Sequence, residues 1–219
     1  MLKAAIFDFD GTLFDSNDIW ETAGERFFRS IGIAPKPGLQ QEIRTMSLYQ
    51  SACYIQEEYK LALSVDEIME GINRTVAHAY LQEVQPKVGV RPFLQQLRDA
   101  GIRMCIATAT DRYQIEAALR RCDMLDFFDA IFTCTEIGHG KDEPVIFQKA
   151  MKFLGTDRSD TVIFEDALHA VQTAKADGFL TVSIFDPYIQ EQEQLQKLCD
   201  CYLTEFGQSE QFWKLASQQ

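Results

Sequence analysis

Short apolar segments alternate along this chain with segments whose apolar residues recur at helical spacing, and this alternation limits the possible folds most. Five short segments are rich in β-branched or aromatic residues and are bounded by turn or polar residues: Leu2–Phe9, Ile102–Thr108, Ala130–Thr133, Thr161–Glu165 and Leu180–Phe185. Segments of helical period lie between the later ones: Arg91–Asp99, Arg112–Arg121, Pro144–Leu154 and Leu168–Asp177. Strands that alternate with helices form a parallel sheet with helices on both faces, so the sequence predicts an α/β fold. A final helix, strand and helix are expected at Ile189–Leu198, Asp200–Leu203 and Gln208–Ala216.

The stretch from Asn17 to Pro86 interrupts this alternation. It contains no strand-like run, and its apolar residues recur at helical spacing, as at Ile19, Ala23 and Phe27. Ser64 is expected to cap a helix within it. Since the stretch lies between the first and second strands, it must be an insertion. We therefore expect an α/β core domain of residues 1–16 and 87–219 and an inserted all-α domain of residues 17–86.

The charge of the chain excludes several kinds of partner. With 33 acidic and 21 basic residues among 219, the formal net charge is −12. Nucleic acid and anionic membranes would repel such a protein, so we expect neither as a partner. No apolar run approaches the ~20 residues that span a bilayer, and the first apolar segment is too short for the core of a signal peptide. The six cysteines lack redox or zinc spacing, so we expect buried reduced thiols in a cytoplasmic protein, and we expect a monomer because no heptad pattern occurs.

Residues able to perform chemistry follow four of the predicted strands. They are Asp8-Phe9-Asp10-Gly11-Thr12, Thr108-Ala109-Thr110, Gly140-Lys141 and Glu165-Asp166. Because open parallel sheets bind ligands at the carboxyl ends of their strands, we expect these groups to meet at one edge. Each also has an ordinary interpretation, since an Asp-x-Asp-Gly sequence often forms a turn and an acidic pair often caps a helix. Thr108 could simply end a strand, and Lys141 could lie in solvent.

These segments resemble the four motifs of the haloacid dehalogenase superfamily of phosphatases. The resemblance covers essentially the whole chain, and the helical insertion is similar to the small cap of β-phosphoglucomutase-like members. It implies a Rossmann-like core with an inserted helical cap. The third motif departs from the family's Gly-Lys-Pro-x-Pro-Asp: here the lysine of Gly140-Lys141-Asp142-Glu143-Pro144-Val145 is kept, two carboxylates are added and the last acid is absent.

The resemblance also implies a role for each motif in phosphoryl transfer. Asp8 would be the nucleophile that forms an aspartyl-phosphate, and Asp10 would protonate the leaving group and then deprotonate water. The Thr108 hydroxyl, the Ala109 amide and the Lys141 ammonium would hold the phosphoryl oxygens.

The charges of these residues imply a metal ion. Asp8, Asp10, Glu165 and Asp166 carry about −4 together and a phosphate adds about −2, against +1 from Lys141, while like charges ~4 Å apart repel by roughly 4 kcal/mol at an effective dielectric constant of 20. Hard oxygen ligands suit Mg²⁺. By resemblance its ligands are Asp8, the main-chain carbonyl of Asp10 and Asp166, with Glu165 binding it directly or through water.

We therefore expect a Mg²⁺-dependent phosphatase that acts on a small phosphorylated metabolite, of the sugar phosphate or phosphoglycolate type. Trp20 occupies the position of the cap histidine of mutase members, which favours water as the phosphoryl acceptor, although a phosphomutase stays an alternative. A second alternative is a non-catalytic, receiver-like Mg²⁺-binding domain, against which the long insertion argues. Trp20 and Arg44 are candidate substrate contacts in the cap, where Arg44 could equally be a surface arginine.

Overall fold

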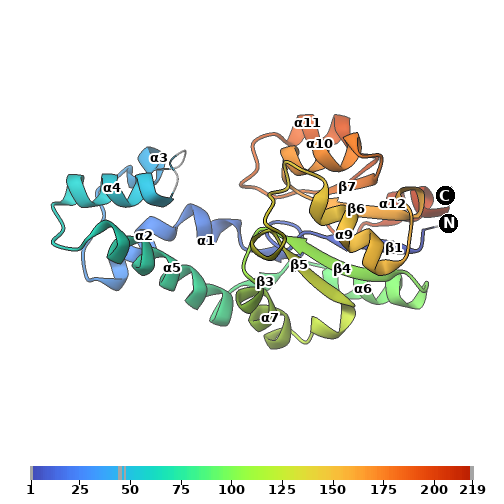
Figure 1. Cartoon of the computed structure of the whole chain (residues 1–219), viewed down its shortest axis with the longest axis horizontal. Coiled ribbons are helices and arrows are strands. Elements are labelled where there is room, and N and C mark those ends of the chain that lie inside the picture. The colour runs from blue at the N-terminus through green and yellow to red at the C-terminus, as the bar shows by residue number, and fades with distance from the viewer. Residues whose placement is uncertain (1, 44–45, 47, 218–219) are drawn as a thin grey trace. The chain divides into compact units, whose positions relative to one another are not determined.

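The structure, a computed structural model, describes residues 2–43, 46 and 48–217. The chain divides into two compact units, Met1–Asp15 with Val84–Gln219, and Ser16–Glu83. The first unit contains a six-stranded sheet flanked by helices, and the second is built from helices (Figure 1). An α/β core with a helical insertion is the fold class that the sequence predicts, and it is confirmed.

The sheet is parallel, with the strand order β5-β4-β1-β6-β7-β8. Its strands are β1 (Ala4–Phe7), β4 (Arg103–Thr108), β5 (Ala130–Thr133), β6 (Thr161–Glu165), β7 (Leu180–Ile184) and β8 (Cys201–Leu203). The chain proceeds outward from β1 to β5 and then crosses to β6 on the other side of β1, so the strand order reverses between β1 and β6. In open α/β sheets a ligand binds at this reversal, outside the carboxyl ends of the strands.

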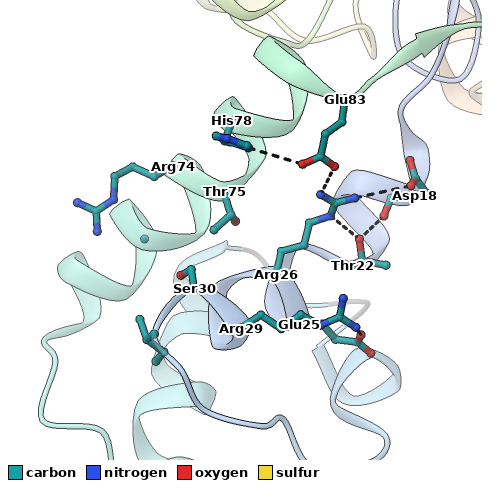
Figure 2. A pocket seen from close by; sticks show the side chains of 12 residues that line it. Asp18, Thr22, Glu25, Arg26, Arg29, Ser30, Arg74, Thr75, His78 and Glu83 are labelled. Carbon is teal, nitrogen blue, oxygen red and sulfur yellow. Dashed lines mark hydrogen bonds and ion pairs between the residues drawn. The ribbon is translucent and has the colours of Figure 1, made fainter.

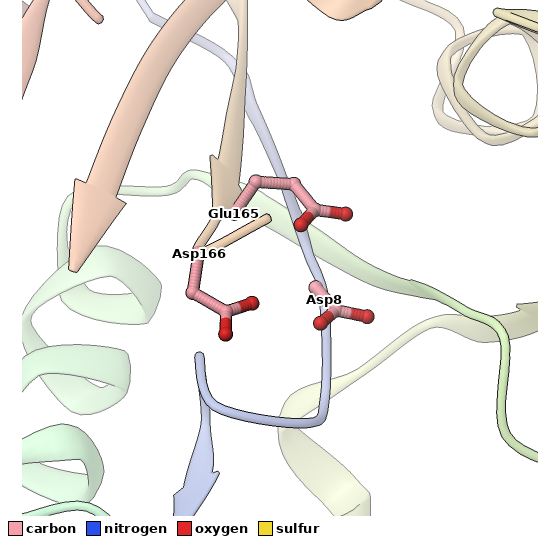
Figure 3. A group of neighbouring side chains, drawn as sticks. All are labelled: Asp8, Glu165 and Asp166. Atoms are coloured by element: carbon pink, nitrogen blue, oxygen red, sulfur yellow. The ribbon is translucent and has the colours of Figure 1, made fainter. Parts of the chain in front are cut away.

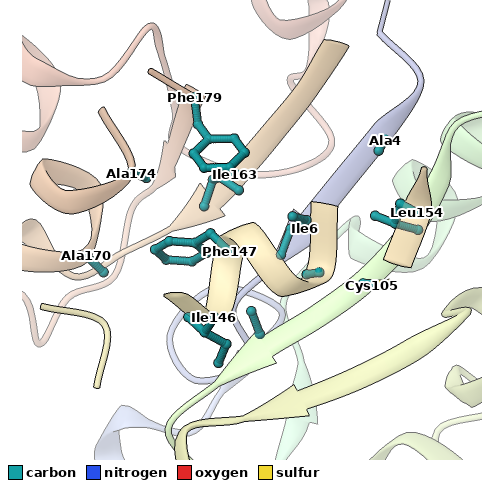
Figure 4. Packing of buried hydrophobic residues seen from close by; sticks show 12 residues of the cluster. Ala4, Ile6, Cys105, Ile146, Phe147, Leu154, Ile163, Ala170, Ala174 and Phe179 are labelled. Atoms are coloured by element: carbon teal, nitrogen blue, oxygen red, sulfur yellow. The ribbon is translucent and has the colours of Figure 1, made fainter. Parts of the chain in front are cut away.

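Each face of the sheet is covered by helices because successive side chains of a strand point to opposite faces. The helices of this unit are α6 (Val90–Asp99), α7 (Arg112–Arg121), α8 (Cys134–Ile137), α9 (Val145–Leu154), α10 (Leu168–Ala176), α11 (Gln192–Leu198) and α12 (Glu210–Ser217), with short 3₁₀ turns η1 (Leu125–Phe127) and η2 (Arg158–Asp160). On one face, Ile6 and Ile163 pack with Phe147 of α9 and Ala170 of α10 (Figure 4).

The opposite face carries a cluster of aromatic rings. Phe7 and Phe164, the cross-strand partners of β1 and β6, stack with their ring centroids 4.3 Å apart. Phe93 of α6 and Phe212 of α12 lie edge-on or tilted to Phe164 at 5.6 and 5.4 Å. Both central strands are therefore buried on two sides, which explains why they appear in the sequence as continuous apolar runs.

The structure contains a short antiparallel ribbon that the sequence did not predict. Residues Phe14–Asp15 (β2) pair with Gln85–Pro86 (β3), where the chain leaves and re-enters the α/β unit. The expectation of no strand between Asn17 and Pro86 is therefore wrong at its last two residues. A two-residue strand shows no alternation of polar and apolar side chains, so nothing in the local sequence indicates it.

The helical unit consists of α1 (Asn17–Glu21), α2 (Ala23–Ser30), α3 (Leu39–Ile43), α4 (Leu48–Tyr59) and α5 (Val65–Gln82). Ser64 caps α5 as expected, in a capping box with Glu67. Helix α5 packs on α2 at Gly71, where a Cβ atom would lie 2.5 Å from the Phe27 ring. A larger residue at this close approach of the two helices would therefore force the Phe27 ring to move.

Two expectations about the chain as a whole can be compared with the structure. In the described part of the chain, no helix has the length and apolar character needed to cross a bilayer. All six cysteines lie in that part and are free. Cys105 and Cys201 are buried, but the other four are only half-buried, so the expectation of buried thiols is wrong for them.

Candidate active site

Three carboxylates meet at the carboxyl ends of β1 and β6. Asp8 directly follows β1, Glu165 ends β6 and Asp166 follows it, and Figure 3 shows their side chains facing one another. Each contributes an oxygen that lies within 4.8 Å of the others. The register accounts for this meeting, because Phe7 pairs with Phe164 and the Asp8 amide donates to the Phe164 carbonyl at 2.9 Å. The residues are only 7%, 1% and 3% exposed, respectively.

Among the described residues, one buried ammonium lies against this group. Lys141, in the loop before α9, donates to Asp8 and to Glu165, whose Oε1 is 2.5 Å from Nζ. Burial acts to lower the pKa of Lys141, but the charges of Asp8 and Glu165 outweigh it and raise that pKa. Burial raises the pKa of Asp8 well above its ordinary value, with Lys141 opposing and Glu165 and Asp166 adding to the rise. One cation thus compensates three buried carboxylates only in part.

The second aspartate of the first motif lies on a turn that begins where β1 ends. Gly11 adopts a φ of 67°, which suits glycine, and its amide donates to the Phe14 carbonyl at 2.9 Å. Asp10 accepts a hydrogen bond from the hydroxyl of Thr110, with Oγ1 and Oδ2 2.6 Å apart. This bond joins the loop after β1 to the loop after β4.

The second motif forms a turn at the end of β4. Thr108, the last residue of the strand, is buried, Ala109 is exposed, and Thr110 is buried. The backbone N–H of Thr110 donates to Thr108 Oγ1 at 3.1 Å. The structure therefore places Thr108 and Thr110 in one turn, and the hydrogen bond from Thr110 places Asp10 beside that turn.

Two threonines with contacts in the site were not predicted from the sequence. Thr110 donates to Asp10, and the hydroxyl of the buried Thr12 donates to Asp166 Oδ1 at 3.3 Å. Both threonines belong to motifs that the sequence analysis identified, and this position within a motif is the only sequence feature that indicates a role for them. A threonine whose partner lies about a hundred or more residues away has no local pattern to reveal it.

The two additional carboxylates of the third motif lie at the surface. Asp142 and Glu143 are exposed, whereas Lys141 beside them is buried. Glu143 Oε2 lies 3.2 Å from His139 Nδ1. The departure from the family motif therefore adds no charge to the buried group around Asp8.

The candidate cap residues are described only in part. Trp20 of α1 is exposed, and its Nε1 donates to the hydroxyl of the buried Tyr80 of α5 at 3.0 Å. Arg44 lies outside the described residues. No observation tests either residue as a substrate contact, so both assignments stay predictions.

The helical unit has a cavity of about 910 Å³ beside α2 and α5 (Figure 2). Arg26 lies within it, and its guanidinium is 2.7 Å from Glu83 and 4.0 Å from Asp18. These acidic neighbours already balance the arginine charge. The described residues that line this cavity include none of the predicted site residues.

Comparison with known proteins identifies the family. The model of the haloacid dehalogenase-like hydrolases matches residues 5–184, which include all four motifs. The chain belongs to this family. The expectations of this superfamily and of an enzyme are thereby confirmed.

Named relatives and solved structures agree with this assignment to the haloacid dehalogenase-like hydrolases. The Thermotoga maritima "Phosphorylated carbohydrates phosphatase" is 24% identical over 177 residues, which cover 81% of this chain and 82% of that protein. Escherichia coli K12 "Hexitol phosphatase B" is 26% identical over 195 residues, covering 86% of each. The crystal structure of a candidate β-phosphoglucomutase from Thermotoga maritima matches with a TM-score of 0.85 and 21% identity over 98% of this chain and 99% of that one, a likeness of fold.

Proposed function

We propose that this protein is a Mg²⁺-dependent phosphatase that hydrolyses a small phosphorylated metabolite, of the sugar phosphate or phosphoglycolate type, through an aspartyl-phosphate. The observation that carries the proposal is the buried group of Asp8, Glu165 and Asp166 with Lys141 at the strand-order reversal. The two phosphatases named above support the reaction type and favour phosphorylated carbohydrates and hexitols within the substrate class.

The residues present fit Mg²⁺. Asp8, Glu165 and Asp166 supply a donor set made entirely of oxygens, and their charge exceeds what Lys141 can balance. We assign Asp8, Asp166 and the main-chain carbonyl of Asp10 as ligands. Glu165 already accepts from Lys141 and would orient that ammonium as well as a ligand or bound water. When bound, Mg²⁺ would neutralise charge on the phosphoryl oxygens.

Asp8 is the proposed nucleophile. One of its carboxylate oxygens forms a bond to phosphorus while the bond between phosphorus and the leaving oxygen breaks, and Asp10 gives that oxygen its proton. Asp10 then removes a proton from water, whose oxygen attacks the aspartyl-phosphate, and the bond between Asp8 and phosphorus breaks. Phosphate is released and both aspartates return to their starting states.

The remaining residues of the site bind the phosphoryl group. The Thr108 hydroxyl and the Ala109 amide donate to its oxygens, and Lys141 supplies a positive charge. The backbone N–H of Thr110 points at Thr108 Oγ1 and occupies it as an acceptor, so the Thr108 hydroxyl proton is directed elsewhere. Lys141 is held by Asp8 on one side and Glu165 on the other, so little reorganisation would be needed when phosphate binds.

The decisive experiment measures phosphate release from a panel of sugar phosphates, hexitol phosphates and phosphoglycolate, with Mg²⁺ and with a chelator. We expect sustained turnover that requires Mg²⁺, is abolished in Asp8→Asn and persists in Asp142→Asn. The latter variant is the matched control, because Asp142 is an exposed carboxylate beside Lys141.

Other outcomes would favour the alternatives. Interconversion of sugar phosphate isomers faster than phosphate release would identify a phosphomutase. One stable phosphoryl group for each chain, without turnover, would identify a receiver-like domain. Absence of any phosphoryl transfer would contradict all three interpretations.

A further inference from the structure

We propose that Thr110 is a positioning residue that sets the orientation of the Asp10 carboxyl group for proton transfer. This inference rests on the proposed function, in which Asp10 exchanges a proton with the leaving oxygen and with water. It concerns what holds the Asp10 carboxyl group in place during that exchange.

The contact between the two side chains is short and shielded. Thr110 Oγ1 donates to Asp10 Oδ2 at 2.6 Å, which is at the short end of the range for a hydroxyl donating to an oxygen. Thr110 is only 6% exposed, so water has little access to compete for its hydroxyl. The two residues are separated by 100 positions in the chain, so the bond joins two loops that local sequence does not connect.

The backbone of Thr110 is itself fixed by the second motif. Its N–H donates to Thr108 Oγ1 at 3.1 Å, which closes a tight turn at the end of β4. Thr108 is completely buried at the last position of that strand, whose register with β1 places Ile106 beside Phe7. The position of the Thr110 hydroxyl therefore derives from the sheet itself, and a side chain that it holds is held by a rigid element.

The consequence concerns the position of the Asp10 carboxyl group. Asp10 lies on a turn and is only partly buried, and the hydrogen bond from Thr110 fixes its Oδ2 relative to the end of β4. An acid misplaced by about 1 Å loses about a hundredfold in rate, so this single hydroxyl is expected to affect turnover.

The loss of rate on removing the Thr110 hydroxyl should depend on the leaving group. This dependence distinguishes a positioning role from a general disturbance of the site. An alkoxide needs its proton in the transition state, whereas p-nitrophenolate leaves readily without one. Loss of the Thr110 hydroxyl should therefore slow an alkyl phosphate such as a hexitol phosphate far more than p-nitrophenyl phosphate. A change that disturbed the whole site would slow both alike.

The test compares Thr110→Val, which removes the hydroxyl and keeps the backbone N–H, with Thr110→Ser, which keeps both. In Thr110→Val we expect kcat for the hexitol phosphate to fall about 10- to 100-fold. We expect kcat for p-nitrophenyl phosphate to change less than about threefold, with KM and the Mg²⁺ requirement unchanged. Thr110→Ser should restore turnover of both substrates. Thr135→Val is the matched control, because it removes a hydroxyl that donates to the Asp111 carboxylate at 3.0 Å on the exposed surface.

Equal losses for both substrates in Thr110→Val, or no loss for either, would overturn the inference. If thermal denaturation shows that Thr110→Val does not fold, Thr110→Ala and Thr110→Ser provide the comparison, since they differ by one hydroxyl. Asp10→Asn separates this inference from the proposed function. If Asp10→Asn shows the leaving-group dependence and the Thr110 variants do not, only the role of Thr110 is wrong; if Asp10→Asn lacks it, the acid role of Asp10 is wrong.

Discussion

Lys87 and Asp186 form an ion pair whose side chains are only 9% and 2% exposed. Lys87 follows β3 and Asp186 lies just beyond β7. The Lys87 ammonium donates to Asp186 Oδ2 at 2.9 Å and to the Phe185 carbonyl at 3.1 Å, and Asp15 Oδ1 lies 3.1 Å away. The ammonium therefore makes two hydrogen bonds and a second ion pair. The pair attaches the β2–β3 ribbon to the carboxyl end of β7.

Removing one partner of this pair should destabilise the α/β unit. Asp186→Ala leaves a buried ammonium with the exposed Asp15 as its remaining carboxylate, and we expect a loss of about 3 kcal/mol in the free energy of unfolding, measured by urea denaturation. Asp129→Ala is the control, because Arg103 and Asp129 form a pair that is 48% and 40% exposed. It should cost less than about 1 kcal/mol. Similar losses in the two variants would mean that burial does not set the strength of the Lys87 pair.

Mg²⁺ should stabilise the folded protein by binding to the cluster of Asp8, Glu165 and Asp166. An ion present at 100 times its Kd stabilises the state that binds it by about 2.7 kcal/mol. The midpoint temperature of thermal denaturation should therefore rise when Mg²⁺ is added and fall back to its starting value when a chelator is added. Asp166→Asn should remove most of the shift because it removes a proposed ligand. Asp142→Asn, an exposed position next to Lys141, should keep it. A shift that persists in Asp166→Asn would place the metal elsewhere.

Lys141→Met should remove activity while leaving the nucleophile in place. The ammonium is the described cation that contacts both Asp8 and Glu165, and loss of one such electrostatic contact costs about 10²- to 10³-fold in kcat. Lys141→Arg should recover little of it, because a planar guanidinium does not fit a buried position shaped for a compact ammonium. The measurement is steady-state phosphate release, with circular dichroism to verify folding. Full activity in Lys141→Arg would show that charge alone is sufficient.

The buried thiols should make stability fall at alkaline pH. Burial raises the pKa of Cys105 from 9.0 to about 12, and burial with the neighbouring Cys199 raises that of Cys201 to about 11. In the unfolded chain thiols ionise near pH 9, so their contribution to stability is complete below that pH and is lost as pH rises toward 11 and 12. The slope of unfolding free energy between pH 9 and 11 should be shallower in Cys105→Ala than in the wild type.

Thiol reagents provide a second measurement of the same property. At pH 8 the native protein should leave Cys105 and Cys201 unmodified, and urea should expose all six cysteines. Rapid modification of Cys105 in the native protein, located by mass spectrometry, would contradict its burial.

The strands and the motif positions were predictable because each depends on a local pattern. The runs that became β1, β4 and β6 are apolar at their centres, since strands in the middle of a doubly covered sheet have no polar side. Once Phe7 and Phe164 are neighbours in that sheet, Asp8 and Glu165 must emerge at the same edge. A chain with these runs, of which the first and the last lead into carboxylates, therefore indicates both the fold and the place of the site before any coordinates are known.

The contacts that orient the site came only from the folded chain. Thr110 with Asp10, Thr12 with Asp166 and Lys87 with Asp186 each join residues from different loops. Threonine and lysine are common in surface loops, so the residue type alone does not indicate a role in the site. The hydrogen-bond partner of each depends on which loops lie side by side once the sheet has formed. The exposure of Asp142 was equally unpredictable, because neighbouring loop residues have no fixed period that would separate it from the buried Lys141. Periodicity is a property of neighbours along the chain, whereas a hydrogen bond across 100 residues is a property of three-dimensional packing.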